Sequence, residues 1–469
     1  MNADNLPTLL TRRNFLGTSA CSTMSTTCLL NTILTLRHMN AQAADVLTPG
    51  TPYKAIVCVF LYGGNDSNNE VIPRESSAHA KYTTSRTVLA IPQANVLALN
   101  TLNDNGLQLG LHPSMTGCRD LYNAGKLALL TNVGTLIAPA TMSDYRNRTA
   151  AIPDNLFSHS DQQLQWQTSA STMNAAYNQT GWGARMAEAL VGTQARTSVS
   201  MLVSLSGTNF FQVGKTMLPF RPGPGGTPVF RLGQGSSSQD VTRYTAFRNI
   251  LNAEYANLME DAFADLSNKS IIEADTINTA LQGTSNFPTI PNSGLGEQLR
   301  TVAKMIQAQG PLGITRQIFF VATGGFDTHG PQLGDHANLL GGVSAALKGF
   351  QDGLETIGMG NSVTSFTASD FNRTFDSNGR GSDHGWGGHH LIMGGDVVGQ
   401  KVYGSFPDPD ISVAGNPLNT GRGNWIPTTA VDQYAATMAK WFGLSDTQIR
   451  DVFPNIQNFT ADLGFMKAV

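Results

Sequence analysis

Carboxylate and imidazole side chains gather in two glycine-rich segments of this 469-residue chain, 324-GGFDTHGPQLGDH-336 and 381-GSDHGWGGHH-390. Five of the nine histidines lie there, although charged residues make up only 13% of the sequence. Aspartate oxygens and histidine nitrogens are ligands that zinc, manganese and iron use in proteins. The concentration of these residue types therefore predicts a metal site.

The spacing of these residues suits a shared ion. Asp327 and His329 alternate along the backbone, so in an extended loop both side chains would point the same way. Asp383 and His384 are adjacent in a loop without bulky neighbours, and Asp66 follows two glycines. Two neighbouring ions there could clamp the attacking and leaving oxygens of phosphoryl or sulfuryl transfer. The structural alternative is that the aspartates cap turns and the histidines satisfy buried backbone groups.

Alternating strand and helix patterns must position these side chains. Short apolar runs predict buried strands at 55–62, 127–134, 199–207, 317–325 and 363–369. Helical periodicity predicts helices at 247–266, 297–309 and 336–358. This alternation predicts an α/β fold with a mostly parallel sheet covered on both faces. The carboxyl ends of parallel strands share one edge, and Asp66, Asp327 and Asp370 each follow a predicted strand there.

The N-terminal segment predicts export. Residues 1–44 contain the pair Arg12-Arg13, a weakly apolar stretch and the small residues 41-AQAA-44, which together resemble a twin-arginine signal cleaved after Ala43. An amphipathic helix or a signal anchor is the alternative. We therefore expect a periplasmic or otherwise exported protein that is soluble after cleavage. Residues 45–469 would form one α/β domain with a helical insertion near 240–285.

Composition excludes other functions. The formal net charge is −3, and no long basic run or basic-aromatic pattern occurs, so nucleic-acid binding is not expected. No cysteine cluster or haem motif supports a redox function. Cys58 and Cys118 remain after the predicted cleavage, and the sequence leaves open whether they pair.

Eight strings in this chain resemble an exported family known as domain of unknown function 1501. In chain order they are 60-FLYGGNDSNNEVIP-73, 110-GLHPSM-115, 156-LFSHSDQQLQWQTS-169, 181-GWGARMAE-188, 325-GFDTHGPQ-332, 369-SDFNRTF-375, 381-GSDHGWGGHHLIMGG-395 and 402-VYGSFP-407. The family looks like a branch of the alkaline phosphatase-like superfamily. The resemblance therefore implies a three-layer α/β/α sandwich with one or two metal ions at the strand ends, and a second exported protein as a partner.

The resemblance also implies a ligand set for the metal: Asp66, Asp327, His329, Asp370, Asp383 and His384. Asp370 stands where the family usually has glutamate, and Asp383 is either a ligand or the orienting partner of His384. The Asp-His spacing at 327–329 is shorter than in the phosphatases, and no histidine directly follows Asp370. Either departure points to one ion in place of two, with zinc, manganese, calcium or iron as candidates.

The superfamily further needs a nucleophile at a helix N-terminus, where backbone N–H groups favour an anion. Ser158 is the candidate, and His159 beside it would be a ligand or a base. Ser158 and Asp161 also fit a plain helix cap. Arg373 either grips an anionic substrate oxygen or anchors its loop. No Cys-x-Pro-x-Arg string occurs, so a formylglycine nucleophile is not expected.

The predicted function is a metal-dependent hydrolase-like protein acting on a small anionic ester, a phosphate or a sulfate. The alternative is a non-catalytic metal-binding, structural or partner-binding protein of the cell envelope, which the weak nucleophile signal favours.

Overall fold

The computed structural model describes residues 51–103, 106–149, 152–170, 179–191, 199–222, 237–412 and 415–468. The predicted signal at 1–44 lies outside these ranges. The chain divides into two compact units, one containing residues 237–273 of the described chain and the other containing the rest of it. Among the described residues, no helix combines the length and apolarity needed to cross a membrane.

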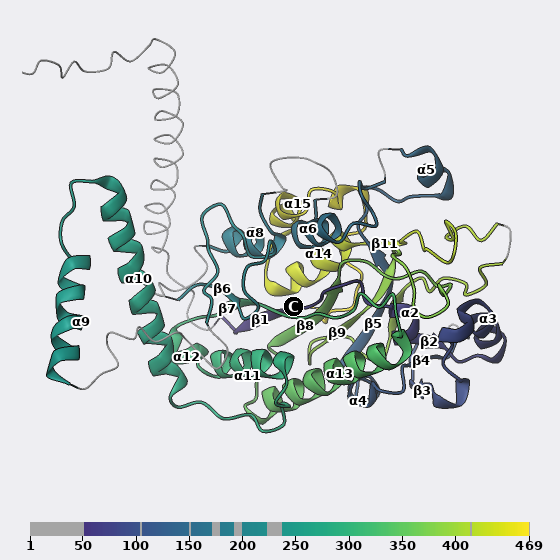
Figure 1. Cartoon of the computed structure of the whole chain (residues 1–469), viewed down its shortest axis with the longest axis horizontal. Helices are drawn as coiled ribbons and strands as arrows, with labels where there is room; N and C mark the ends of the chain where they lie inside the picture. Colours follow the sequence, from purple (N-terminus) through teal and green to yellow (C-terminus); the bar gives the residue numbers. More distant parts are fainter. Residues whose placement is uncertain are drawn as a thin grey trace, which may run out of the picture. The chain divides into compact units, whose positions relative to one another are not determined.

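A mixed, mostly parallel sheet forms the centre of the larger unit (Figure 1). Its strand order is β10-β5-β9-β8-β1-β7-β6, and β11 pairs with β5 beside this path. The strands are β1 (Lys54–Leu61), β5 (Leu127–Gly134), β6 (Leu202–Ser204), β7 (Arg316–Thr323), β8 (Val363–Ser369), β9 (Gly388–Met393), β10 (Val402–Gly404) and β11 (Thr429–Ala430). A small antiparallel sheet consists of β2 (Val71–Pro73), β4 (Leu109–Leu111) and β3 (Leu97–Ala98).

The apolar runs of the sequence form the central strands. β1 lies between β7 and β8, pairs in parallel with both, and all of its residues are buried. Full burial on both faces explains why this strand is a continuous apolar run without alternation. β9 runs antiparallel to β5 and β8, because a loop without a crossover helix connects it to β8. The predicted α/β fold with a mostly parallel sheet is confirmed.

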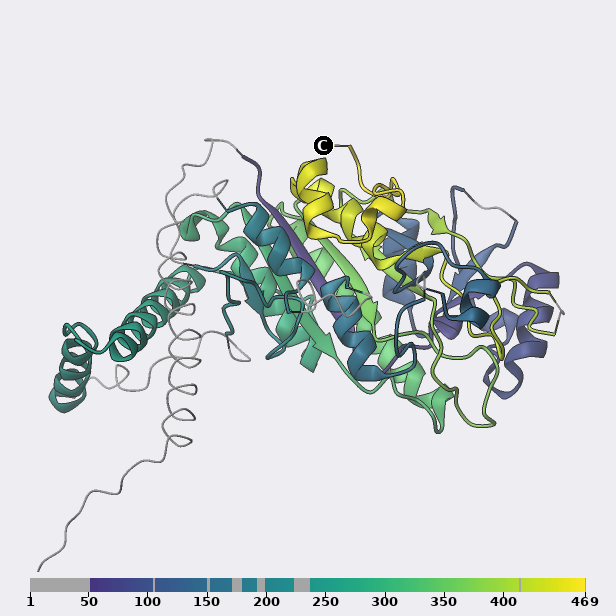
Figure 2. The same ribbon diagram turned by 90° about the horizontal axis from the view of Figure 1, so that it is seen from above.

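Helices cover both faces of the sheet (Figures 1 and 2). One face packs on α4 (Thr116–Asn123), α11 (Gly294–Gln307) and α13 (Gln332–Thr356). The other face packs on α8 (Trp182–Ala189), α14 (Val431–Phe442) and α15 (Asp446–Val452), with Trp166 from α6 (His159–Thr168). Shorter helices are α2 (Ser67–Glu70), α5 (Met142–Asn147) and α12 (Gln309–Leu312), and α3 (Ser76–Arg86) leads from the small sheet. The result is the expected three-layer arrangement.

The predicted helix at 247–266 is wrong, because two helices occupy this region. α9 (Ser238–Leu251) ends before Asn252, and α10 (Leu258–Leu281) begins after Asn257, whose side-chain oxygen accepts a hydrogen bond from the Met259 N–H at 2.9 Å. Asparagine side chains compete with helical hydrogen bonds in this way, which favours a break. Leu251, Ala264 and Ile271 form a small core within this unit.

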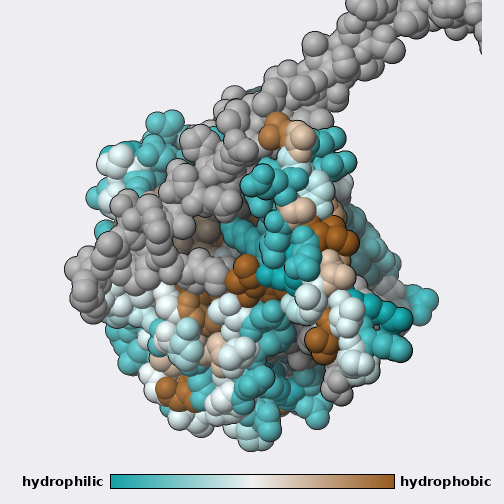
Figure 3. Space-filling view, turned by 90° about the vertical axis from the view of Figure 1, so that its left-hand side faces the viewer, coloured by the Kyte–Doolittle hydropathy of each residue, from teal (hydrophilic) through white to brown (hydrophobic). Residues whose placement is uncertain are grey.

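Apolar side chains of this unit also reach solvent. On α10 the exposed ones are Leu258, Met259, Phe263, Leu266 and Ile272. Figure 3 shows one face of the molecule, on which apolar residues are interspersed among hydrophilic ones. Whether residues 240–285 act as an insertion that shapes a pocket or a partner surface stays a prediction.

Candidate metal centre

Loops at the carboxyl edge of the sheet bring the site together. Gly63 follows β1, Asp327 follows β7 and Asp370 follows β8. Gly63 has φ +114°, and a Cβ there would collide with the backbone of Asp327. Only glycine therefore lets the loops after β1 and β7 approach so closely. His159, the first residue of α6, and His384, in the loop before β9, complete the surroundings.

Three of these side chains converge. Each of His159, Asp327 and His384 offers a ligand atom, and these atoms all lie within 4.8 Å of one another. The Nε2 of His159 is 3.6 Å from Oδ2 of Asp327, and the Nε2 of His384 is 3.5 Å from Oδ1. Ligand atoms at zinc–nitrogen bond lengths in a tetrahedron lie about 3.3 Å apart. The observed separations therefore fit ligands that share one ion.

Hydrogen bonds at Nδ1 orient both imidazole rings. The Nδ1 of His159 contacts Oδ2 of Asp370 at 2.7 Å, and the Nδ1 of His384 contacts the Phe157 carbonyl oxygen at 2.8 Å. Carbonyl and carboxylate oxygens accept, so Nδ1 donates and the neutral ring keeps its lone pair on Nε2. Metal-binding histidines are held by such acceptors in the same way. Both Nε2 lone pairs face Asp327.

His329 is a fourth side chain at this point. Its Nε2 lies 3.1 Å from Oδ1 of Asp327 and 3.0 Å from the Nε2 of His384, while its Nδ1 contacts Oδ1 of Asp383 at 3.2 Å. When the Nδ1 atoms of His329 and His384 both donate, the Nε2 lone pairs of these two rings face each other across 3.0 Å. They repel unless a proton or a metal ion lies between them. The nitrogen and oxygen atoms of this cluster are thus arranged to bind a cation.

Asp327 is the most open member of the cluster, with a side chain 48% exposed. Desolvation raises the pKa of its carboxyl, but the hydrogen bond and charge of Arg373 and the nearby histidines outweigh it, so the pKa is below the usual value. The carboxylate therefore stays ionised at neutral pH. For His384, desolvation dominates and lowers the pKa, which keeps the ring neutral and able to bind a cation.

Asp370 lies behind His159 and is fully buried. Its Oδ2 accepts from Gln163 at 2.9 Å as well as from His159, and its carboxylate faces the Gly63 N–H at 3.3 Å. Desolvation raises the pKa of Asp370, and these three hydrogen bonds only partly oppose the rise. Its observed contacts are those of a residue that orients His159, one contact away from the cluster.

Asp383 has a similar position behind His329. Desolvation raises the pKa of its carboxyl, but Arg422, Asn378 and His329 lower it to about 2. The Nη1 of Arg422 donates to Oδ2 at 2.5 Å and Asn378 donates to Oδ1 at 3.1 Å. Asp383 is thus an ionised acceptor that fixes the His329 ring.

Asp66 lies apart from the three clustered side chains. It is fully buried, paired with Arg86 and hydrogen-bonded by Gln332 through Oδ2, while its Oδ1 has no hydrogen-bond partner among the described residues. Arg86 also donates to the Thr374 carbonyl at 3.1 Å. A buried carboxylate needs such a cationic partner because desolvation penalises its charge.

Ser158 is the N-cap of α6. Its hydroxyl donates to Oδ2 of Asp161 at 2.5 Å and lies 3.5 Å from the Asp161 N–H. These are the contacts of a helix cap. Ser158 also sets the start of α6 and thereby places His159 at the cluster. The sequence left His159 open as a ligand or a base, outside the six-residue ligand set, and its position directly after a capping serine in 156-LFSHSDQQ-163 was the signal available.

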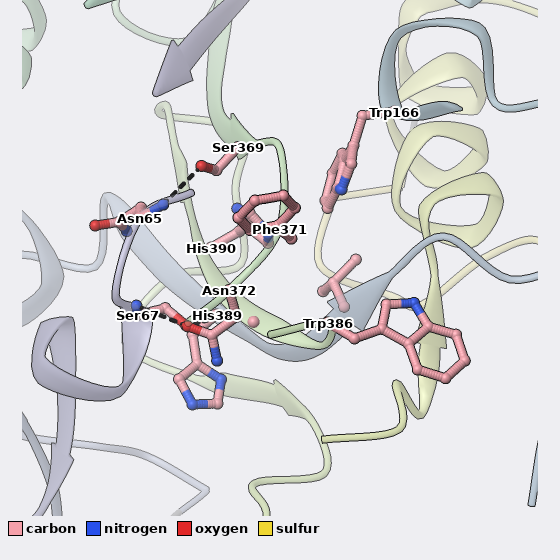
Figure 4. Close-up of a pocket in the computed structure, with 11 residues that line it drawn as sticks. Asn65, Ser67, Trp166, Ser369, Phe371, Asn372, Trp386, His389 and His390 are labelled. Carbon is pink, nitrogen blue, oxygen red and sulfur yellow. Dashed lines mark hydrogen bonds between the residues drawn. The ribbon is translucent and has the colours of Figure 1, made fainter. Parts of the chain in front are cut away.

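Phe371 lines a small cavity (Figure 4) and also contacts two histidines of the cluster. Its ring lies 4.8 Å from that of His159 and 4.5 Å from that of His384, centroid to centroid. The cavity is also lined by Trp166, Trp386, His389 and His390. Burial lowers the pKa of His389 and of His390 to about 3, so both are neutral. Neither belongs to the group of clustered ligand atoms.

Fold and site together define an α/β sandwich protein with a His/Asp cluster at the carboxyl edge of its sheet. The sequence pattern of the family described as Protein of unknown function (DUF1501) matches residues 53–453, and the chain belongs to this family. None of the curated proteins compared with the chain matches it.

Among solved structures, one match is the crystal structure of Ps i-CgsB in complex with k-i-k-neocarrahexaose. The two chains are 11% identical, and the alignment covers 87% of this chain and 77% of the other with a TM-score of 0.33. A similarity of this size carries no information on substrate or mechanism.

Proposed function

We propose that this protein is a metal-dependent hydrolase of phosphate or sulfate esters, with a divalent ion held by His159, Asp327 and His384. The observation that supports this most is the convergence of these ligand atoms within 4.8 Å, each histidine being oriented through Nδ1. His329 would complete the site or lie beside it. Zinc suits this mixed nitrogen and oxygen set best.

A divalent ion bound there would supply Lewis acidity toward an ester oxygen. Side chains of the protein would position the metal ligands. Asp370 and the Phe157 carbonyl hold the two histidines in position, and Asp383 holds His329. Arg373 contributes its charge to Asp327 from within the protein, at 3.0 Å, and is fully buried. The cluster opens to solvent at Asp327, where a substrate can approach.

Membership of the alkaline phosphatase-like superfamily is part of this proposal, and it is supported by the strand-end position of the cluster. Export is a further part. The resemblance of residues 1–44 to a twin-arginine signal supports action outside the cytoplasm. Comparing the N-terminal residue of the protein from the cell envelope with that of the full chain would test this part.

The first experiment is metal content by mass spectrometry on protein purified without chelators. We expect about one divalent ion per chain, lost in Asp327→Asn and in a His159→Ala/His384→Ala double variant. The matched control is Asp376→Asn, whose carboxylate is comparably exposed but lies outside the cluster, and this variant should keep the ion. A wild-type protein free of metal, with its fold intact, would refute the proposed site.

Turnover is then measured on 4-nitrophenyl phosphate, 4-nitrophenyl sulfate and, as a neutral comparison, 4-nitrophenyl acetate. Hydrolysis of an anionic ester that requires the ion and Asp327 supports the proposal. A protein that binds the ion but turns over none of these esters is better described as a metal-binding protein of the cell envelope. The contacts of Ser158, which are those of a helix cap, are the observation that favours this alternative.

A further inference from the structure

Arg373, predicted either to grip a substrate anion or to anchor its loop, uses four of its five N–H donors within the protein. The side chain of Arg373 is fully buried, and its N–H groups go to protein acceptors. Nε and Nη2 donate to the Ser382 carbonyl at 3.0 and 2.6 Å, and Nη1 donates to the Gly63 carbonyl and to Asp327, both at 3.0 Å. These contacts anchor the loops of the site and keep the guanidinium away from solvent.

Arg422 differs from Arg373 in its exposure to solvent and in the number of its N–H donors that the protein uses. Its side chain is 46% exposed, and within the described residues it makes one hydrogen bond, from Nη1 to Oδ2 of Asp383 at 2.5 Å. The nearest contact of its Nε with Asp376 is 3.8 Å, beyond hydrogen-bonding distance. Guanidinium carries five N–H donors. Most of them thus remain available to a ligand at the surface.

A constrained turn presents Arg422. Its backbone has φ +57°, the left-handed region, which is unfavourable for a residue with a Cβ. Asn419 Oδ1 accepts from the N–H groups of Gly421 and Gly423, both at 2.9 Å, and the Arg422 carbonyl accepts from Asp376 N–H at 3.0 Å. Backbone strain retained by such surroundings often marks a ligand-binding position.

Three successive contacts connect Arg422 to Asp327 of the cluster. The Asp383 carboxylate that accepts from Arg422 through Oδ2 also contacts the Nδ1 of His329 through Oδ1, at 3.2 Å. The Nε2 of His329 in turn lies 3.1 Å from Asp327. A substrate bound at the cluster and extending toward this turn would therefore meet a half-exposed guanidinium with free donors.

We infer that Arg422 is the residue that binds an oxyanion of the substrate and so makes the site selective for anionic esters. This inference rests on the proposed function, because it names the anion-recognising group of the same site. The planar guanidinium matches a phosphate or sulfate oxyanion through paired N–H···O hydrogen bonds. Asp383 holds Arg422 at the mouth of the site when no substrate is bound, and the free N–H groups engage the anion.

The test is calorimetric titration of the full chain with inorganic phosphate and, separately, inorganic sulfate, together with the variants Arg422→Ala, Arg422→Lys and Arg380→Ala. Arg380 is the matched control, because it is an exposed arginine near the same mouth and its backbone carbonyl accepts from Gln332 N–H. Arg422→Ala should weaken anion binding about tenfold. Arg422→Lys should recover only part of the loss, since lysine cannot form the paired contact. Arg380→Ala should bind as the wild type does.

Equal losses in Arg422→Ala and Arg380→Ala would overturn the inference in favour of general surface charge, and so would an unchanged affinity in Arg422→Ala. Metal content and melting temperature of Arg422→Ala should equal those of the wild type, which a merely structural role would not give. Anion titration requires no turnover, so it separates the two proposals. If ester hydrolysis is found and Arg422→Ala leaves its KM for an anionic ester unchanged, this inference fails while the proposed function stands.

Discussion

Replacing Asp370 by Asn separates a residue that orients a ligand from a ligand itself. The sequence predicts Asp370 as a metal ligand, whereas in the structure its Oδ2 contacts the Nδ1 of His159 at 2.7 Å. Asparagine keeps the shape and one acceptor oxygen, so the ring can still be held. It removes the negative charge that makes the imidazole a better donor to a cation.

The two roles differ in magnitude. Removing an acceptor that holds a metal-binding histidine typically weakens metal affinity about 10–100-fold. A structural zinc site of four ligands is worth about 10–16 kcal/mol, so one ligand contributes about 3–4 kcal/mol, or a factor of about 10²–10³. We therefore expect Asp370→Asn to weaken zinc binding about 10–100-fold and His159→Ala to weaken it more.

The assay is competition for zinc between metal-free protein and a chromophoric chelator of known affinity. Melting temperature is measured in parallel, because Asp370 is buried and a general loss of folding would also release the ion. The reasoning is refuted if Asp370→Asn costs as much as His159→Ala, which would make Asp370 a ligand. It is equally refuted if Asp370→Asn binds zinc as the wild type does.

Three further outcomes are expected. Arg86→Ala leaves the buried Asp66 charge without its partner, so it should lower the free energy of unfolding by about 3–5 kcal/mol in urea titrations. The metal content of this variant should be unchanged. Loss of the ion would instead place Asp66 in the metal site. Desolvation raises the pKa of Glu70 to about 8, so between pH 4.5 and 8 the folded protein retains a proton that the unfolded chain releases. The free energy of unfolding therefore has its highest value below pH 4.5, the usual pKa of glutamate, and falls as the pH rises toward 8. Glu70→Gln should therefore gain stability relative to the wild type between pH 5 and 8, by at most about 1.4 kcal/mol per pH unit in melting curves. A difference in unfolding free energy that does not change with pH would contradict the assigned cause. Ser158→Ala should lose a helix cap worth about 1 kcal/mol without losing ester hydrolysis, and abolished turnover in a folded variant would restore Ser158 as the nucleophile.

The sequence was sufficient where local pattern decides structure. Apolar runs identified β5 and β8 at their observed bounds and β1 and β7 within two residues, since full burial on both faces requires such runs. The helix at 247–266 failed because local asparagine hydrogen bonds interrupt an apolar periodicity that continues on both sides.

For the site, sequence by itself determined the residue types and the sheet edge. Asp66 and Asp327 both follow a strand after two glycines, so the same edge position was predicted for both, although only Asp327 has a histidine two residues on. Only the tertiary structure decided that Arg86 of α3 neutralises Asp66 in the interior, whereas Asp327 opens to solvent beside His159 and His384. These partners lie far from the aspartates in the sequence. Tertiary packing determines which groups surround a carboxylate, and those groups determine whether its charge is neutralised inside the protein or can bind an ion.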